Sequence, residues 1–556
     1  MKTRYFIICG LAACGMLLAG CVKQLEQSNP NMATESIFWQ TEEDFDKGLT
    51  SCYAALKGFG GYFGVRGVEL RICRGDDVTF RNDLQAIKQL GEFINDASNG
   101  QISSTFNNFY TCIYRSNLTR QHLEEISDQF SSDFVNRVRG ECLFIRGLSE
   151  HLLAREFRAA PLRLVASQSP EDFQLANSSQ EEIWKQAIAD LTEAASLLPV
   201  KNPVAGRPTK GACYAVIGKT YVYLEDFDNA IKALEPLTKS PYTYALGDFK
   251  WNFDEAHEND LNPESIFEVL IDTGGGTSEW SSETANTAQT NVRPCEFGAP
   301  EIGGWYEATA TQKMMDIFLA EPDKDGNVDY RARMSVAWDY PGCIYYKMPF
   351  QERFTTESSR NTYWFLKYQN WDTRDKEPQP VYSAINERAI RYADVILLLA
   401  ESYLRKSSPD FGKAVSYINM IRERANLNPY GGGMDYQAIF NDLEHQRAIE
   451  FFIEGQRFYD LRRWGLLEQR LKEGGNDARY QQYMSGKSGN GNKFDYFPIP
   501  TGEITTNCSV SRIPSGDKDL IRLKPIARPS KAARSLFPDC VSSRVILCPI
   551  CERPLI

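Results

Sequence analysis

The spacing of apolar residues predicts helices in several long stretches of this chain. In residues 41–56, an acidic first turn precedes Phe45, Leu49, Cys52 and Leu56, which fall at helical spacing on one face. The same steps of three and four residues recur in residues 106–118, 137–157 and 181–198. We therefore predict an amphipathic helix with a buried stripe in each of these stretches.

Two stretches carry the spacing of a tetratricopeptide repeat, which is a pair of antiparallel helices. Residues 208–237 match it, with Gly218, Tyr221, Ala230 and the following Pro241 at or within one position of the consensus. A weaker copy spans residues 388–425 and has the matching residues Ala400, Tyr403, Ala414, Ile418 and Ile421. Together with the other helices, these repeats predict a mostly α fold on a tetratricopeptide-like scaffold of helical hairpins.

The segment between the two repeats, residues 242–385, differs in kind. It is rich in Trp, Tyr, Gly, Thr and Asn, and its regular stretches are a strand-like alternation at 265–271 and a helical pattern at 312–319. We predict a large, irregular, loop-rich insertion on the helical frame. Because loops held on a rigid frame often carry binding residues, we expect a ligand-binding face here.

Residues 443–464 combine an apolar helical stripe with a high density of charge. Ile449, Phe452 and Ile453 share one face, while acidic and basic residues recur three apart along what we predict to be a single helix. Two interpretations are open. The stretch is either a solvated surface helix or the site of a partly buried network of Glu450, Glu454 and Arg457.

The first residues predict export and a lipid anchor. Two basic residues precede an apolar run, residues 5–18, which suits a signal peptide and is short for a spanning helix. The sequence Leu-Ala-Gly-Cys that ends at Cys21 resembles the bacterial lipobox, in which the Cys thiol receives a diacylglycerol. We predict a lipoprotein signal peptide over residues 1–20, acylation of Cys21, and a tether over residues 21–40. The alternative is an ordinary secretory signal followed by a chance Cys.

Charge and histidine content argue against several classes of function. The net charge of −11 argues against a nucleic-acid binder, which needs a basic face. The four His residues lack metal-ligand spacing, so we predict neither a zinc site nor a His-based catalytic triad. Asp323 begins a calcium-like run, but an EF-hand needs Gly and an acid where Val328 and Met334 stand, which favours a solvated turn. The cysteines of the body are scattered singly and favour free, buried thiols.

Three motifs connect the chain to a known family. The pattern ExxRAIEFFxEGxRFxDLRRW, which begins at Glu444, resembles the C-terminal signature of the SusD/RagB family. Residues 140–164 resemble that family's early repeat helix, and Tyr-Phe-Pro-Ile-Pro at 496–500 resembles its closing motif. We therefore treat residues 41–507 as one SusD/RagB-like domain.

The resemblance carries expectations about function. Members of the family are outer-membrane lipoproteins of Bacteroidetes that bind nutrients, usually glycans. The resemblance implies that the helical frame docks on a SusC-like TonB-dependent transporter. The resemblance also implies that the irregular segment and the early loops together form the ligand face.

Aromatic rings in the irregular segment are the candidate sugar contacts. A pyranose has an apolar face of C–H bonds that a flat ring covers, and a rim of hydroxyls that carboxylates, amides and Arg satisfy. Each ring alone is either core or site, but as a set in a loop-rich segment we predict ligand contacts at Trp280, Trp305, Tyr306 and Trp338. From the early loops, where we expect the charged run 74–82 to be at the surface, the family resemblance adds as rim partners Asp77, Arg81 and Asn99.

The end of the chain departs from the family pattern. Residues 508–556 carry nine Lys or Arg against four Asp or Glu, although the chain as a whole is acidic. They show no convincing helical or strand period. A shifted or misjoined reading frame that replaced the true end is one interpretation, and a genuine basic appendage is the other.

These observations predict a lipoprotein at the cell surface that binds glycans and delivers them to an outer-membrane transporter. No reaction, cofactor or metal is implied, so we do not predict an enzyme. One alternative is a tetratricopeptide-like adaptor that binds only protein, against which the aromatic-rich insertion argues. The other is a surface glycosidase, for which Asp76 or Asp77 supplies at most half of the carboxylate pair.

Overall fold

The computed structural model describes residues 38–57, 61–81, 83–257, 262–271, 292–377, 383–489 and 491–510. Within these ranges helices predominate, and the strands form short two-stranded antiparallel ribbons. The predicted mostly α fold is confirmed. The predicted signal peptide, Cys21 and Trp280 lie outside the described residues, as do residues 511–556 of the tail.

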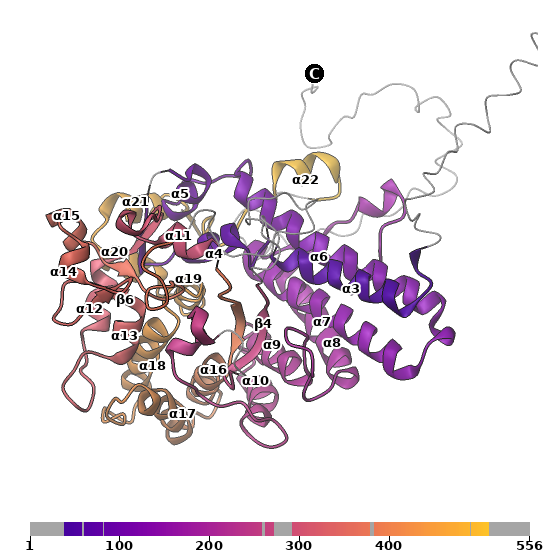
Figure 1. Cartoon of the computed structure of the whole chain (residues 1–556). Coiled ribbons are helices and arrows are strands. Elements are labelled where there is room, and N and C mark those ends of the chain that lie inside the picture. The colour runs from indigo at the N-terminus through magenta and orange to yellow at the C-terminus, as the bar shows by residue number, and fades with distance from the viewer. Residues whose placement is uncertain are drawn as a thin grey trace, which may run out of the picture. The chain divides into compact units, whose positions relative to one another are not determined.

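The early helices pack against one another in chain order. Neighbours along the sequence contact each other, as Figure 1 shows for the indigo-to-magenta layer of α3 (Glu42–Lys57), α6 (Gly100–Glu125), α7 (Ser132–Phe157), α8 (Gln180–Leu197), α9 (Lys210–Tyr223) and α10 (Phe227–Leu234). Small residues allow the close approach: a Cβ on Gly147 of α7 would lie 2.8 Å from Leu191 of α8. Ser179 caps α8 through a capping box with Glu182.

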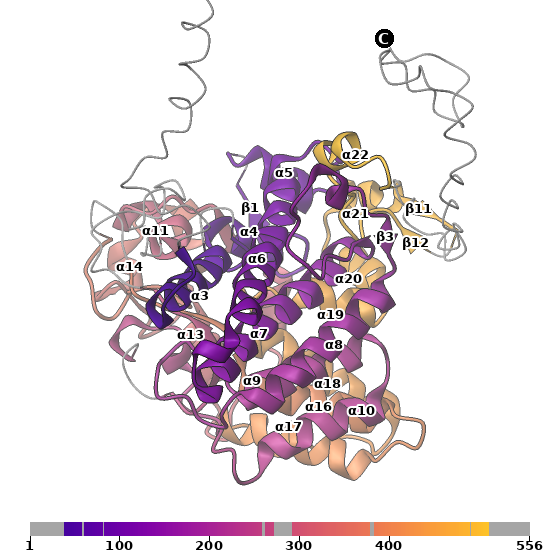
Figure 2. The ribbon, with the colours of Figure 1, turned by 90° about the vertical axis from the view of Figure 1, so that its right-hand side faces the viewer.

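Both predicted repeats are helical hairpins. Residues 208–237 form α9 and α10, and a Cβ on Gly218 would meet Leu234 at 2.3 Å, which explains the small residue. The second repeat forms α16 (Tyr392–Arg405) and α17 (Phe411–Arg424). Its first residues are a strand instead of a helix, because β10 (Glu387–Arg391) pairs with β4 (Ser265–Val269). Helices α10 and α16 contact each other, and Figure 2 shows both hairpins at the lower edge of the view.

The insertion is irregular, as predicted, and has a core of its own. Its short elements beyond β4 are α11 (Arg293–Phe297), β5 (Ala308–Ala310), α12 (Gln312–Phe318), α13 (Tyr330–Ser335), β6 (Val336–Ala337), β7 (Ile344–Tyr345), β8 (Met348–Pro349), α14 (Phe350–Arg353), α15 (Glu357–Arg360) and β9 (Trp364–Phe365). The apolar face predicted for residues 443–464 packs into this core, because Ile449, Phe452 and Ile453 join Phe318 and Phe365 in one buried cluster.

The prediction of one continuous helix over residues 443–464 is wrong. Helix α18 (Tyr436–Glu450) ends, a turn follows, and α19 (Arg457–Arg463) begins. Within the turn Ile453 has φ +53° and Gly455 has φ +72°, which no α-helix accommodates. The backbone at Gly455 also passes so close to Arg71 that a Cβ would lie 2.6 Å from the Arg71 Cβ.

Glu450, Glu454 and Arg457 are buried, so the surface-helix interpretation is wrong, and the network interpretation holds for Glu450 and Glu454, which share Arg391. Glu450 is fully buried and lies 3.1 Å from Arg391 and 3.3 Å from Arg331. Glu454 lies 2.7 Å from Arg391 and 2.6 Å from Lys367. Burial lowers the pKa of Lys367 to about 8, although the neighbouring Glu454 carboxylate opposes this shift.

The partners of Arg457 differ from the predicted ones. Arg457 lies 2.7 Å from Asp76 and 3.3 Å from Glu444, and so belongs to a cluster separate from that of Glu450 and Glu454. The expectation that residues 74–82 lie at the surface is wrong for its first half. Arg74, Asp76 and Asp77 are 1%, 5% and 3% exposed. Arg74 pairs in the interior with Glu156 and Asp76 pairs with Arg457, and Asp77 is buried next to Asp76.

The remaining α-helices and strands are short. They are α4 (Val65–Ile72), β1 (Val78–Phe80), α5 (Gln85–Gly91), β2 (Ala160–Pro161), β3 (Asn177–Ser178), α20 (Leu467–Glu473), α21 (Asp477–Met484), β11 (Lys487–Ser488), β12 (Gly491–Asn492) and α22 (Thr501–Thr506). As predicted, the described cysteines of the body are buried thiols outside any disulfide bond, and Cys508 is an exposed thiol. No helix in the described ranges combines the length and hydropathy needed to cross a membrane.

Candidate functional site

A two-stranded ribbon brings an early loop beside the irregular segment. β1 pairs with β5 so that Thr79 lies opposite Thr309 and Phe80 opposite Ala308. The residues that flank this pairing are Arg81, just after β1, and Tyr306 and Glu307, just before β5. The Arg81 guanidinium lies 4.4 Å from the centre of the Tyr306 ring. Two predicted ligand residues from distant parts of the chain, Arg81 in an early loop and Tyr306 in the irregular segment, therefore come together.

The Tyr306 ring is held at the surface by its backbone. Gly303 and Tyr306 both have positive φ, +85° and +42°, and the Tyr306 N–H donates to the Gly298 carbonyl at 3.0 Å. Gly304 passes so near Gly298 that a Cβ would lie 2.1 Å from that carbonyl oxygen. Tyr306 is 37% exposed, and its ring stands at 81° to the buried Trp364 ring, with 6.3 Å between the ring centres. A non-glycine residue held at positive φ is strained, which is common where a side chain must be aimed.

Arg81 is anchored by carboxylates on both sides. Its Nη2 lies 2.9 Å from Glu307 Oε1 and 2.7 Å from Asp83 Oδ2, and its backbone N–H donates to the Glu307 carbonyl at 2.9 Å. We did not single out Glu307 from the sequence. The one sequence signal for it is its position next to Tyr306. Arg81, Glu307 and Tyr306 form what we call the Tyr306 platform, in which a flat ring lies beside a charged donor, and the buried Glu307, 6% exposed, holds that donor in place.

The predicted tryptophans lie in the same segment as the platform but differ in setting. The Trp305 side chain is half-buried against Val292 and Cys295, and the Trp305 backbone N–H donates to the Cys295 carbonyl at 2.7 Å. Trp338 is half-buried directly after β6, with its ring centre 4.2 Å from that of Tyr340. Both rings are partly open to solvent.

The remaining two predicted rim residues are used inside the protein. Asp77 is 3% exposed, and burial followed by the charge of Asp76 raises its pKa to about 7. Asn99 is 4% exposed and caps α6, since its side-chain oxygen accepts from the Gln101 and Ile102 N–H groups. Their burial gives both residues structural roles, so the platform retains only Arg81 from the early loops.

The structure also shows how the residues that we considered for metal binding are arranged. Within the described ranges, no three His, Cys, Asp or Glu side chains are arranged to hold a metal ion. The run at Asp323 is the expected turn: its Oδ1 accepts from the Asp325 and Asn327 N–H groups at 2.9 and 2.8 Å. Pro322 and Val328 close this turn as an isolated bridge.

The chain is similar to known proteins in both sequence and structure. A model described as SusD family matches residues 263–515, and one described as starch-binding associating with outer membrane matches residues 24–223. A SusD superfamily protein of known structure from Bacteroides vulgatus is 55% identical, with a TM-score of 0.79 over 85% of this chain and 99% of that one. SusD-like protein P2 from Formosa agariphila is 24% identical over 521 residues, covering 89% of this chain and 96% of that protein.

A more distant structure shares the fold. Surface glycan-binding protein A from Bacteroides uniformis is 20% identical, with a TM-score of 0.66 over 85% of this chain and 99% of that one. The identity of 55% to a SusD superfamily protein over nearly the whole of that protein confirms the resemblance that the signature and closing motifs indicated. The chain belongs to the SusD/RagB family.

Proposed function

We propose that this protein is a glycan-binding lipoprotein of the outer membrane that captures oligosaccharides at the cell surface and delivers them to a SusC-like TonB-dependent transporter. The observation that carries the binding function is the Tyr306 platform, an exposed ring fixed by a strained backbone and flanked by Arg81 and Glu307. Family membership supports the same function, since a matching family model describes starch binding at the outer membrane.

The platform has the chemistry that a sugar ring requires. The exposed Tyr306 ring supplies an apolar face for the C–H groups of a pyranose, while Arg81 and Asp83 stand at its edge with charged groups for hydroxyls. Because Arg81 is already held by Glu307, little side-chain entropy remains to be lost when a sugar binds. Trp305 and Trp338, and Trp280 outside the described residues, are the further rings that we propose for an extended chain of sugars.

The proposed location and partner follow from the sequence and the family. Acylation of Cys21 would hold the protein on the membrane surface, with residues 21–40 as the tether. We propose the tetratricopeptide-like frame as the surface that docks on the transporter. No catalytic step is part of the proposal.

Calorimetry against plant, host and microbial oligosaccharides tests the binding function. On whichever glycan binds, Tyr306→Ala should lower the affinity about tenfold or more, because stacked area and aromatic geometry are lost together. Tyr114→Ala is a matched control, because Tyr114 is a 43% exposed tyrosine of α6 that does not belong to the platform. Equal affinities of the two variants would place the site elsewhere.

The two alternative functions make different predictions in the same assays. Release of reducing ends from any glycan of the panel by purified protein would favour a surface glycosidase. An adaptor that binds only protein would show no heat with any glycan while still forming a complex with the transporter. Co-purification of the transporter together with Tyr306-dependent glycan binding is the combination that our proposal requires.

A further inference from the structure

A pocket of about 450 Å³ lies between the loop before α6 and the closing segment of the domain, outside the Tyr306 platform. Its floor is apolar, since Phe157, Phe497 and Ile499 are 3%, 3% and 4% exposed. Two backbone hydrogen bonds join its walls: Phe497 N–H to the Glu156 carbonyl at 2.8 Å, and Thr501 N–H to the Ala97 carbonyl at 2.9 Å. The volume is that of a small-molecule site rather than of a packing defect.

One side of the pocket carries positive charge that the protein leaves unpaired. Arg158 ends α7 in the left-handed region, with φ +64°, and its guanidinium lies 5.8 Å from the centre of the Tyr496 ring. Among the arginine side chains of the described ranges, only that of Arg158 has neither a hydrogen bond nor an ion pair. Lys493 stands on the same pocket with its Nζ 4.6 Å from the Phe494 ring. A half-buried Arg158 beside an exposed Lys493 favours an anionic partner.

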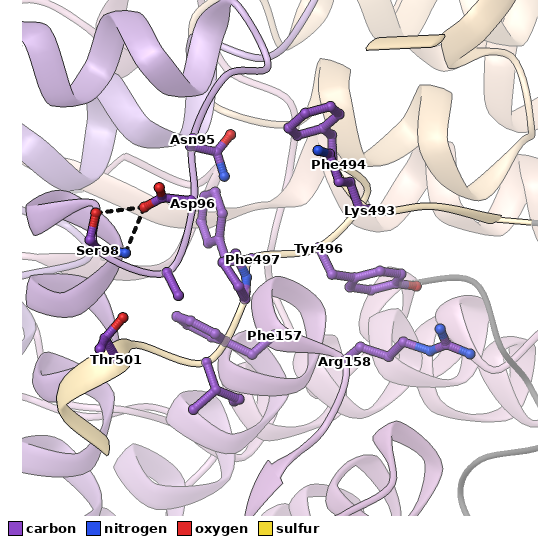
Figure 3. Close-up of a pocket in the computed structure, with 13 residues that line it drawn as sticks. Asn95, Asp96, Ser98, Phe157, Arg158, Lys493, Phe494, Tyr496, Phe497 and Thr501 are labelled. Carbon is purple, nitrogen blue, oxygen red and sulfur yellow. Dashed lines mark hydrogen bonds between the residues drawn. The ribbon is translucent and has the colours of Figure 1, made fainter. Parts of the chain in front are cut away.

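The opposite side carries a fixed acceptor. Asp96 Oδ1 accepts from the Ser98 N–H at 2.8 Å and from the Ser98 hydroxyl at 2.6 Å, and these bonds lower the pKa of Asp96. Asp96 Oδ2 is left for a donor from outside. Figure 3 shows Asp96 and Ser98 on one side, Arg158 beside Tyr496 on the other, and Phe157 with Phe497 between them.

From this arrangement we infer that the pocket binds a saccharide unit that carries a carboxylate, of the uronic-acid class and one or two sugars long. The carboxylate pairs with Arg158 and Lys493, ring hydroxyls donate to Asp96, and the C–H face lies over the floor of Phe157 and Phe497. A pyranose carboxylate presents all three features on one small ring, which a neutral sugar does not. The inference rests on the proposed function in naming a saccharide, and it adds a second subsite that discriminates by charge.

Calorimetry with three disaccharides tests this inference: those of glucuronate, galacturonate and mannuronate. Each is compared with its counterpart in which the carboxylates are reduced to hydroxymethyl groups. We expect at least one uronate to bind about tenfold or more tightly than its reduced form, since a charge-assisted hydrogen bond is lost on reduction. Raising the salt concentration should narrow the difference in affinity between the uronate and its reduced form, because Lys493 is exposed to solvent.

Three variants assign the charge preference to the pocket. Arg158→Gln should bring the affinity for the uronate close to that for its reduced form. Lys493→Gln changes an exposed side chain and should leave the fold intact, and it should also weaken the preference for the uronate. Lys201→Gln removes one charge from an exposed residue elsewhere and should leave the preference unchanged. Equal binding of the acidic and reduced sugars by the wild type, or a preference that survives both pocket variants, would overturn the inference.

The Tyr306→Ala variant separates this inference from the proposed function. Uronate binding to the pocket should survive Tyr306→Ala, because the platform is not part of the pocket lining. Loss of uronate binding in that variant would place the acidic sugar on the platform and overturn the inference. If neutral glycans bind in a Tyr306-dependent way while no uronate is preferred, the proposed function stands and the pocket inference fails.

Discussion

Arg457 and Asp76 form a bidentate ion pair between residues that stand 381 positions apart in the chain. Arg457 Nε donates to Asp76 Oδ1 at 2.7 Å and Nη2 donates to Oδ2 at 3.1 Å, and both residues are buried. Burial raises the pKa of Asp76, but the charges of Arg457 and Lys313 outweigh it and hold that pKa below its usual range. The pair joins α19 to the loop from which the β1 strand emerges.

Removal of Arg457 should therefore destabilise the domain. In Arg457→Ala the buried Asp76 keeps only Lys313 as a cationic partner, at 2.9 Å. Removing one member of a buried ion pair leaves the other charge without its partner and lowers the free energy of unfolding by about 3 to 5 kcal/mol. We expect this loss to appear as a fall of several degrees in the melting temperature. Lys185→Ala breaks an exposed pair with Glu181 and should change the melting temperature little. Equal melting of wild type and Arg457→Ala would contradict a structural role for the pair.

Asp77 gives the stability of the fold a pH dependence of known sign. Its folded pKa is raised from 3.8 to about 7, so the folded state holds the proton more tightly than the unfolded chain does. This contribution to stability is fully present below about pH 4 and is lost as the pH rises to about 7. In Asp77→Asn, which cannot ionise, the gain in urea midpoint over wild type should grow between pH 4.5 and pH 7.5, roughly the window set by these two pKa values.

A second aspartate provides the control for this pH dependence. Asp375 is exposed, and Asp375→Asn should shift the urea midpoint by the same small amount at both pH values. An Asp77→Asn variant that behaves in the same way would show that Asp77 does not titrate near neutral pH.

The helical scaffold was predictable from local sequence, whereas the pairing of charges was not. The helical hairpin of residues 208–237 was found from the spacing of small and aromatic residues, because its packing is between neighbours in the chain. The partner of Arg457 was not, because Asp76 is brought to it only by the tertiary fold. The same holds for the site, where Arg81 and Tyr306 were named separately but their contact depends on the β1–β5 pairing.

Local signals also misled in places. The charge of residues 74–82 suggested a surface, yet Asp76 is buried in ion pairs with Arg457 and Lys313, and Asp77 is buried beside it. The amide of Asn99 was assigned to a ligand, yet it caps α6. The pocket that contains Arg158 had no sequence signal, because an arginine without a partner looks like any other until its neighbours are placed.

Acylation of Cys21 is tested by cell fractionation. If Cys21 carries the acyl chains, Cys21→Ala removes the buried CH₂ groups that hold the protein on the membrane, each worth about 0.8 kcal/mol. We expect the variant to be soluble in the periplasm or to remain unprocessed. Cys508→Ala, which changes an exposed free cysteine at the other end of the domain, should stay in the membrane fraction. Membrane association of both variants would contradict the lipobox assignment.

The break between α18 and α19 is the feature that lets Arg457 reach Asp76, and Gly455 is the residue that permits it. Gly455→Ala places a Cβ at 2.6 Å from the Arg71 Cβ in addition to the strain of φ +72°. Gly475 has nearly the same φ, +74°, but a Cβ there meets nothing within 4 Å. Gly475→Ala should therefore lower the free energy of unfolding by about 1 kcal/mol, which is the strain of the left-handed region alone. Gly455→Ala should lower the free energy of unfolding by clearly more.

The difference between these two alanine variants isolates the close approach to Arg71. Arg71 is itself held at 2.8 Å from Glu387, so it has little freedom to retreat from a new methyl group, and the turn must shift instead. A shifted turn would carry Arg457 away from Asp76, and Gly455→Ala combined with Arg457→Ala should then cost less than the sum of the two single variants. Urea unfolding of the four proteins in this cycle measures the coupling. Full additivity would show that the turn and the ion pair act independently.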